Sequence, residues 1–97
     1  MNIKQTISND ELRVKIFKAL ADQTRLNVIR TLKSEWQPTP YAQLAASMNC
    51  SKSTASYHLK LLQEAGLITL TKEGQAKSIT LNREVFDGVL PGFLKTL

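Results

Sequence analysis

Side chains that donate or accept hydrogen bonds gather on one side of residues 52–65. Ala55, Leu59 and Leu62 recur there at spacings of four and three, the repeat of an α-helix that buries one face. A solvated helix more often has Glu and Lys on its outer side. Short hydroxyls suit a helix that approaches another surface closely, as a recognition helix does in the major groove of DNA. The outer-face residues are Ser53, Thr54, Ser56, Tyr57 and Lys60.

A shorter helix is predicted just before this one. Residues 41–48 place their apolar side chains, Leu44 and Met48 among them, on one face. Asn49 suits the left-handed backbone conformation that ends a helix, and Ser51 supplies a hydroxyl N-cap for the next one. The three-residue connection has the length expected of a helix-turn-helix.

Two stretches resemble the signature segments of the arsenic-repressor-like (ArsR) family of winged-helix regulators. Residues 51–68 read S-K-S-T-A-S-Y-H-L-K-L-L-Q-E-A-G-L-I, which is similar to that family's recognition helix, S-x-S-T-V-S-x-H-L-x-x-L-x-x-A-G-L-V. Residues 17–32 read F-K-A-L-A-D-Q-T-R-L-N-V-I-R-T-L, which is similar to a second segment, L-x-A-L-A-D-P-T-R-L-x-I-L-x-x-L. Two motifs in the family's order argue against chance agreement and anchor an alignment over about residues 12–81.

The resemblance implies a winged helix-turn-helix, mainly α with a β-hairpin wing, in the order α-α-α-α-β-β-α. It also implies a dimer through the first and last helices. We therefore expect residues 1–97 to form a single DNA-binding domain, with a flexible N-terminus at residues 1–7 and a C-terminal dimerisation helix at residues 83–97. The chain departs from the family at Gln23, where Pro is usual, but the preceding Asp22 cap leaves the helix prediction intact.

The composition agrees with one small domain. A chain of 97 residues, 42% of them hydrophobic, is near the lower end of what folds alone, so a second subunit would add stability. The formal net charge of +5 and a pI near 9.6 favour a polyanionic partner, although a ribosomal or merely soluble basic protein has the same balance. A single cysteine excludes an internal disulfide, and no signal peptide or apolar run of about 18 residues is present. The chain is therefore interpreted as cytoplasmic, with no membrane partner.

The first helix is predicted from its start signals. Ser8 as N-cap and Glu11 three residues later form a capping box, and Ile7 and Leu12 are spaced as a hydrophobic staple. The apolar stripe consists of Leu12, Ile16, Ala19 and Leu20. The basic residues, interpreted as a solvated face, are Arg13, Lys15 and Lys18.

The second helix begins after Asp22, which is its predicted N-cap, and its apolar pattern indicates core scaffold. Trp36, in the connection to the third helix, is interpreted as a local packing residue rather than a ligand platform. The apolar residues of the second helix are Leu26, Ile29 and Leu32, with Val28 on the flank.

A β-hairpin is predicted after the recognition helix. Gly66 ends that helix, residues 67–71 and 78–82 read as strands, and Gly74 supplies the positive φ of a tight turn at residues 72–75. Three polar side chains near its tip are positioned for phosphates or the edge of a minor groove. The alternative is a structural hairpin with solvated lysines. These residues are Lys72, Gln75 and Lys77.

Residues 83–97 are too apolar for a terminal helix that faces only water. Asn82 is the predicted cap, and a kink or break is expected near Leu90, with Pro91 opening a short second piece, because Pro inside a helix removes a backbone hydrogen bond. In the ArsR family this element and the first helix form the dimer interface. The resemblance implies an interface made by Leu12, Ile16, Phe86, Val89, Leu90, Phe93 and Leu94.

Metal sensing and catalysis are not predicted. Family members that sense metals use cysteines before the third helix or Asp and His pairs on the last helix, whereas residues 38–41 hold no cysteine and residues 83–97 no histidine. A zinc site needs about four nitrogen or sulfur ligands, and the chain has one Cys and one His. No nucleophile elbow, phosphate loop or paired acid and base is recognisable, and no cofactor is expected.

Two side chains have alternative roles. His58 flanks the recognition helix, where it would either bond a phosphate or base or act as a partly buried structural residue. The sequence favours neither. Cys50 lies in the turn, where packing as a small hydrophobe is expected. The alternative for Cys50 is a redox switch, because a helix N-terminus favours a thiolate.

Together these features predict a homodimeric transcription regulator, in the first place a repressor, that binds a pseudo-palindromic operator in double-stranded DNA and does not respond to metals. The alternative is a winged-helix module for protein contacts that works through its apolar C-terminal helix, but the polar outer face of residues 51–62 argues against it. A small-molecule or redox effector is not identified. The residues expected to contact DNA are Ser51, Lys52, Ser53, Thr54, Ser56, Tyr57, His58, Lys60, Lys72, Gln75 and Lys77.

Overall fold

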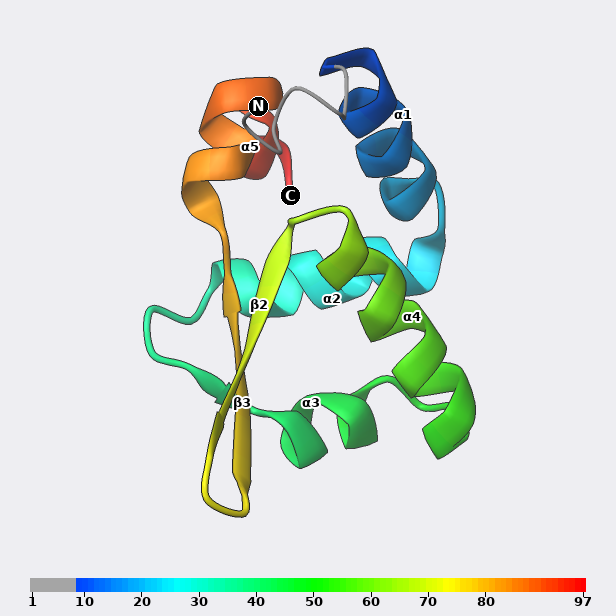
Figure 1. The fold of residues 1–97 in the computed structure, drawn as a ribbon, viewed down its shortest axis with the longest axis vertical. Helices are drawn as coiled ribbons and strands as arrows, with labels where there is room; N and C mark the ends of the chain where they lie inside the picture. Colours follow the sequence, from blue (N-terminus) through cyan, green and yellow to red (C-terminus); the bar gives the residue numbers. More distant parts are fainter. Residues whose placement is uncertain (1–8) are drawn as a thin grey trace, which may run out of the picture.

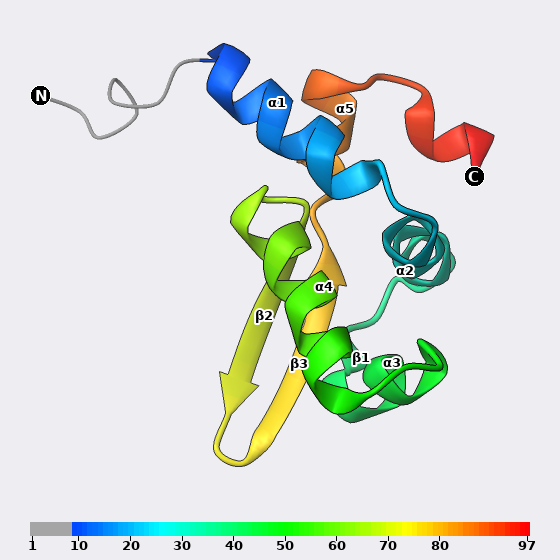
Figure 2. The same cartoon turned by 90° about the vertical axis from the view of Figure 1, so that its right-hand side faces the viewer.

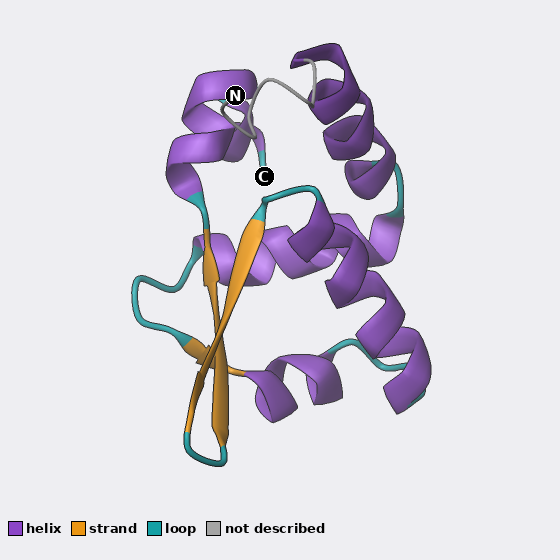
Figure 3. Ribbon diagram, in the orientation of Figure 1, coloured by secondary structure: helices purple, strands orange, loops and turns teal. Residues whose placement is uncertain are grey.

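The computed structural model describes residues 9–97, which form a winged helix-turn-helix (Figures 1 and 3). The predicted order of four helices, two strands and a last helix is confirmed, with one additional short strand before the third helix. The predicted flexible segment 1–7, the Ser8 capping box and the staple residue Ile7 lie outside the described residues. The elements are α1 (Asn9–Leu20), α2 (Gln23–Lys33), β1 (Thr39–Pro40), α3 (Tyr41–Ser47), α4 (Lys52–Glu64), β2 (Ile68–Glu73), β3 (Ala76–Leu81), α5 (Arg83–Val89) and the 3₁₀-helix η2 (Phe93–Thr96).

The elements form a helical body from which the hairpin of β2 and β3 extends (Figures 1 and 2). α1 and α5 lie at the end opposite the hairpin tip, and α3 and α4 lie beside the hairpin. The sheet is antiparallel in the order β1-β3-β2, and β1 joins it by pairing Thr39 with Ile79. β1 has only two residues, and its pairing partner is distant in the sequence. No local sequence pattern therefore predicts it. None of the helices within residues 9–97 has the length and apolar character needed to cross a membrane.

The core lies where α1, α2 and α4 pack together against the hairpin. The predicted apolar stripes supply it, with one shift in α2, where Val28 is 2% exposed while Leu26 is only partly buried. Burying each large side chain contributes roughly 1.5 to 3 kcal/mol. The largest fully buried side chains are Phe86, Ile16, Ile29, Leu32, Leu44, Leu62, Leu67, Ile79 and Val28.

The predicted C-terminal end of α4 is confirmed and holds the wing in place. Gly66 has a φ of 77°, a left-handed conformation that glycine adopts without strain. The Gly66 N–H donates to the Gln63 carbonyl at 3.0 Å and the Leu67 N–H to the Leu62 carbonyl at 3.0 Å. This pair of bonds is a Schellman motif, and it directs the chain from α4 straight into β2.

The wing is longer than predicted. β2 and β3 pair as far as Glu73 and Ala76, which leaves Gly74 and Gln75 in the turn. Gly74 has a φ of 59°, as a two-residue hairpin turn requires. Lys72, predicted in the turn, therefore lies in the strand ladder.

The C-terminal segment breaks near the predicted position. α5 ends at Val89 with Leu90 as its C-cap, Gly92 turns the chain with a φ of 84°, and η2 begins at Phe93 rather than at Pro91. The break expected within residues 83–97 is therefore confirmed, and the two pieces are α5 and η2.

Asn82 is the N-cap residue of α5 as predicted, but its side chain makes no capping hydrogen bond. Its side-chain amide donates to the Gly66 carbonyl at 2.9 Å, and its Oδ1 accepts from the Thr69 hydroxyl at 2.8 Å. Asn82 thus joins the base of the hairpin to the end of α4, a long-range role that outweighs the local one.

Trp36 packs as predicted, but on the surface. Its ring is 79% exposed, and the Arg83 guanidinium lies 3.8 Å from the ring centroid. Arg83 also donates to the carbonyls of Lys33 at 2.9 Å and Glu35 at 3.0 Å. These contacts tie the start of α5 to the end of α2.

Candidate nucleic-acid interface

α4 presents its polar side to solvent as predicted. Ala55, Leu59 and Leu62 are between 0% and 3% exposed, so they fix the helix on the core and turn the opposite side outward. Tyr57 is 59% exposed. We call the outward side the reading face, and it consists of Ser53, Ser56, Tyr57 and Lys60.

The N-cap of α4 engages three of the predicted DNA contacts, and Ser53 Oγ lies 3.3 Å from Ser51 Oγ. Ser51 Oγ accepts the Thr54 backbone N–H at 3.2 Å and donates to Thr54 Oγ1 at 2.9 Å. Both residues are exposed, but their hydroxyls are occupied in holding the helix start. The hydroxyls of Ser56 and Tyr57 form no hydrogen bond within residues 9–97, which leaves them for another molecule.

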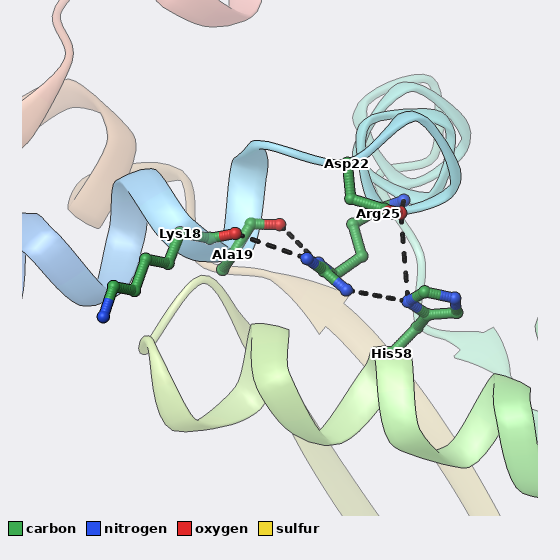
Figure 4. A network of polar contacts seen from close by, with 5 residues as sticks. All are labelled: Lys18, Ala19, Asp22, Arg25 and His58. Carbon is green, nitrogen blue, oxygen red and sulfur yellow. Dashed lines mark hydrogen bonds and ion pairs between the residues drawn. The ribbon is translucent and has the colours of Figure 1, made fainter.

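His58 lies on the inner flank of α4, in a polar network with α1 and α2 (Figure 4). Its Nδ1 is 2.9 Å from Arg25 Nη1 and 3.9 Å from Asp22 Oδ2. Because a guanidinium only donates, Nδ1 is the acceptor in its contact with Arg25. Its side chain is 13% exposed. Of the two alternatives for His58, the structure supports the partly buried structural role.

Arg25 completes this network. Its Nε donates to the Ala19 carbonyl at 2.6 Å and its Nη2 to the Lys18 carbonyl at 3.3 Å. These carbonyls belong to the C-terminal end of α1, where unpaired C=O groups favour a cation. Arg25 therefore fixes the positions of α1, α2 and α4 relative to one another. Arg25 and His58 are 33 residues apart, so no local pattern predicted their contact.

The same network holds the Asp22 carboxylate ionised. Its Oδ2 accepts the Arg25 backbone N–H at 3.0 Å, which makes it the N-cap of α2 as predicted. This hydrogen bond lowers the pKa of Asp22 below its ordinary value of 3.8, and the charge of Arg25 lowers it further, against an opposing effect of partial burial.

Two lysines of the wing lie on the same face of the β2–β3 hairpin. Lys72 and Lys77 are directly paired across β2 and β3, and like charges in that arrangement repel each other. Lys77 Nζ lies 4.4 Å from the centroid of the Tyr41 ring, a cation–π contact that holds it against α3. Gln75 is exposed in the turn beside them. The three predicted wing residues thus lie together near the hairpin tip, and Lys77 contacts the start of α3.

An open groove of about 730 Å³ separates the wing from the helix-turn-helix. It is lined by α3, the N-terminal turns of α4 and the hairpin tip. Two lysines and no carboxylate are found among the described residues that line it. An apolar lining with basic groups matches a sugar-phosphate chain, which alternates apolar deoxyribose with charged phosphate. Its lining includes Tyr41, Ala42, Ala45, Lys52, Ser56 and Lys77.

Cys50 is exposed, so its expected role in packing is wrong. The reason is the preceding Asn49, whose φ of 57° turns the chain after Met48. Met48 packs against the core, and Cys50 lines the groove instead. Within residues 9–97, no three His, Cys, Asp or Glu side chains lie close enough to hold a metal ion.

The predicted dimer-interface residues fall into two groups. Ile16 and Phe86 are 0% and 1% exposed, so assigning them to the interface is wrong, because they fill the core of their own subunit. Phe93 stacks on Phe86 with ring centroids 6.1 Å apart. The other group is partly buried at the edge of this core: Leu12, Val89, Leu90, Phe93 and Leu94.

Two exposed apolar side chains on α1 are not part of the apolar stripe predicted from the sequence. Val14 is 49% exposed and Phe17 is 51% exposed, on the side of α1 away from Ile16. The signal was present in their spacing of three, which forms a second apolar stripe outside the one that fills the core.

Known proteins share this arrangement. Residues 20–71 match the family described as a helix-turn-helix domain. The chain is 43% identical, over 100% of its length and 95% of the relative, to the uncharacterized HTH-type transcriptional regulator YceK of Bacillus subtilis. It is 39% identical to the arsenical resistance operon repressor of the same organism, over 76% of this chain and 70% of the relative.

The fold is also found in a solved structure. The homodimeric winged helix-turn-helix domain of Mb0332 from Mycobacterium bovis, a possible ArsR-family regulator, matches with a TM-score of 0.70 at 19% identity, over 100% of this chain and 94% of that one. With the two signature segments on α4 and around α2, these matches confirm the family resemblance. The chain belongs to the ArsR family of winged helix-turn-helix transcriptional regulators.

Proposed function

We propose that this protein is a repressor that binds a pseudo-palindromic operator as a homodimer, with its two α4 helices in successive major grooves. The observation that carries the proposal is the reading face. Ser56 and Tyr57 are exposed on a helix whose opposite side is buried, and their hydroxyls have no partner within residues 9–97. Exposed, unpartnered hydrogen-bonding groups on a rigid helix are what direct readout of base edges requires.

The polar residues divide into two classes of contact. On a helix inserted by its N-terminus, Ser53, Thr54, Ser56 and Tyr57 are nearest the base edges, although Thr54 is partly engaged by the cap. The basic residues of α4 and the wing contact phosphates, and the repelling pair on β2 and β3 is relieved by an anion between or beside the two ammonium groups. The expected phosphate contacts are Lys52, Lys60, Lys72 and Lys77.

The exposed apolar residues of α1 support the homodimer. Val14 and Phe17, together with the partly buried Val89, Leu90 and Phe93, lie on elements at the end of the subunit opposite the wing tip (Figure 2). Joining two subunits there leaves both wings and both α4 helices free. A two-fold dimer of this kind reads two half-sites about one helical turn apart, and the Mb0332 domain is itself homodimeric.

The named relative is an arsenical resistance operon repressor, which supports repression as the mode of action. We expect a signal other than a metal ion or an arsenical, because Cys50 and His58 are the single cysteine and the single histidine of the chain. We therefore expect zinc, cadmium and arsenite at low micromolar concentration to leave operator affinity unchanged.

Selection of bound duplexes from random-sequence DNA tests the proposal. We expect an inverted-repeat consensus, two chains per duplex in sedimentation, and lower transcription from a promoter that contains the selected site. The same binding assay with added metal ions tests the absence of metal response. Recovery of no consensus would instead favour a module for protein contacts.

A further inference from the structure

A second groove lies on the other flank of α4, between α4 and α1. It has a volume of about 340 Å³, and Figure 2 shows the two helices that border it, α1 and α4. Its lining holds three cationic side chains and one carboxylate, beside an exposed aromatic ring. The lining includes Lys15, Lys18, Arg25, Tyr57, Leu61 and Glu64.

The two lysines of this groove are free to bind an anion. The guanidinium of Arg25 is already occupied by His58 and by the two carbonyls at the end of α1. Lys15 and Lys18 are exposed, and neither makes an ion pair within residues 9–97. Because Arg25 bonds the end of α1 and His58 of α4 (Figure 4), the helix that carries Lys15 and Lys18 is held beside α4.

The geometry of the major groove requires a backbone on each side of α4. That groove is about 12 Å wide between two phosphodiester chains, and a helix with its side chains is about 10 to 12 Å across. Lys52 and Ser56, on one flank of α4, line the groove toward the wing. Tyr57 and Leu61, on the other flank, line the groove toward α1. A duplex seated on the reading face therefore brings one strand to each groove.

We propose that the groove between α1 and α4 receives the second phosphodiester strand of the operator, with Lys15 and Lys18 as its phosphate contacts. The proposal rests on the proposed DNA-binding function and gives a DNA contact to lysines that are exposed, as expected for a solvated face. On α1 these lysines lie next to the exposed apolar residues Val14 and Phe17, and Lys18 is one helical turn beyond Val14. Glu64, in the same groove, opposes the binding of an anion.

The test compares the Lys15→Ala/Lys18→Ala variant with a matched control, Arg30→Gln/Lys33→Gln, which also removes two cations per subunit. The control residues lie at the end of α2, on the side of the subunit away from α4 (Figure 1). Affinity is measured against salt concentration for a duplex selected by the parent protein and for a scrambled duplex. Ethylation interference maps the contacted phosphates on each strand, and circular dichroism checks the fold of each variant.

Four phosphate contacts are lost per dimer in the Lys15/Lys18 variant, so we expect the salt dependence to flatten by roughly three to four units of slope, at about 0.9 per contact. Interference should disappear on one strand bordering each major groove and persist on the other. Glu64→Gln should raise affinity for both duplexes. A Lys15/Lys18 variant with the slope and interference pattern of the control overturns the inference, whereas a parent that does not discriminate the two duplexes overturns the proposed function itself.

Discussion

The two ends of the subunit differ in which side chains they leave exposed. At the wing end, α3, α4 and the hairpin expose hydroxyls and lysines around an open groove. At the opposite end, α1 exposes Val14 and Phe17 beside a partly buried apolar C-terminal segment. The exposed chemistry of the first end suits a hydrated polyanion, and that of the second suits another apolar protein surface.

The difference shows how one small core supports two interfaces. Ile16 on α1 and Leu59 on α4 are both buried, and Arg25 bonds the end of α1 at Ala19 and the middle of α4 at His58. The surfaces proposed for DNA and for a second subunit are therefore built on helices whose relative position is fixed. The predictions below separate the core from the two surfaces.

The largest effect is expected from Phe86→Ala. Phe86 was expected at the dimer interface, but it is 1% exposed and stacks on Phe93. Truncation of a buried Phe leaves a cavity and costs about 3 to 5 kcal/mol of unfolding free energy. Urea unfolding monitored by circular dichroism measures this loss, and a loss below about 1 kcal/mol would place Phe86 outside the core.

The second prediction concerns association. Changing Val14 and Phe17 together to Ser removes four half-exposed apolar side chains from a dimer, at roughly 1 kcal/mol each. We expect the Kd for dimerisation to rise by about 1000-fold with the helical content unchanged. Sedimentation measures this, with Trp36→Ser as the control because that ring is even more exposed and lies outside the proposed interface. If the double variant remains a dimer, α1 is not part of the dimer interface.

A smaller, pH-dependent effect is expected at the Asp22 cap. Asp22→Ala should cost about 0.5 to 2 kcal/mol at neutral pH. Because folding lowers the pKa of Asp22, the cap contributes fully above the ordinary value of 3.8 and is lost as the pH falls through the folded value. The difference in unfolding free energy between the parent and the Asp22→Ala variant should therefore shrink as the pH falls below about 4. Ser51→Ala is the control, because it removes the uncharged cap of α4. Its loss of unfolding free energy should stay the same as the pH falls.

The smallest effect is expected from Cys50→Ser. The thiol is exposed and has no packing role, so unfolding free energy and operator affinity under reducing conditions should match the parent. Because Cys50 lines the groove beside the wing, a bulky alkylating reagent on the parent should weaken DNA binding. If alkylation has no effect on affinity, that groove is not occupied by DNA.

Local patterns were enough to predict most of the wing end. The N-caps Asp22 and Ser51, the turn at Asn49 and the buried stripe of α4 are each set by residues within one or two helical turns. The opposite end was harder because periodicity shows that a face is apolar without showing what covers it. Ile16 and Phe86 were assigned to a partner when their own core buries them, and Val14 and Phe17 were overlooked.

Contacts between distant segments account for the remaining differences. β1 forms through its pairing with β3, the Asn82 side chain bonds Gly66 and Thr69 in place of capping α5, and His58 bonds Arg25. Each of these depends on positions that only the folded chain brings together.

Base recognition by the reading face and phosphate binding by the wing lysines can be distinguished in one set of salt titrations. Affinities of Tyr57→Ala and Lys77→Ala are measured at several salt concentrations on the selected and the scrambled duplex. Tyr57→Ala should lose about 1 to 3 kcal/mol on the selected duplex and little on the scrambled one. Lys77→Ala should lose affinity equally on both and flatten the salt dependence by roughly two units of slope. If Tyr57→Ala binds the selected duplex as tightly as the parent does, α4 is not the reader and the account is contradicted.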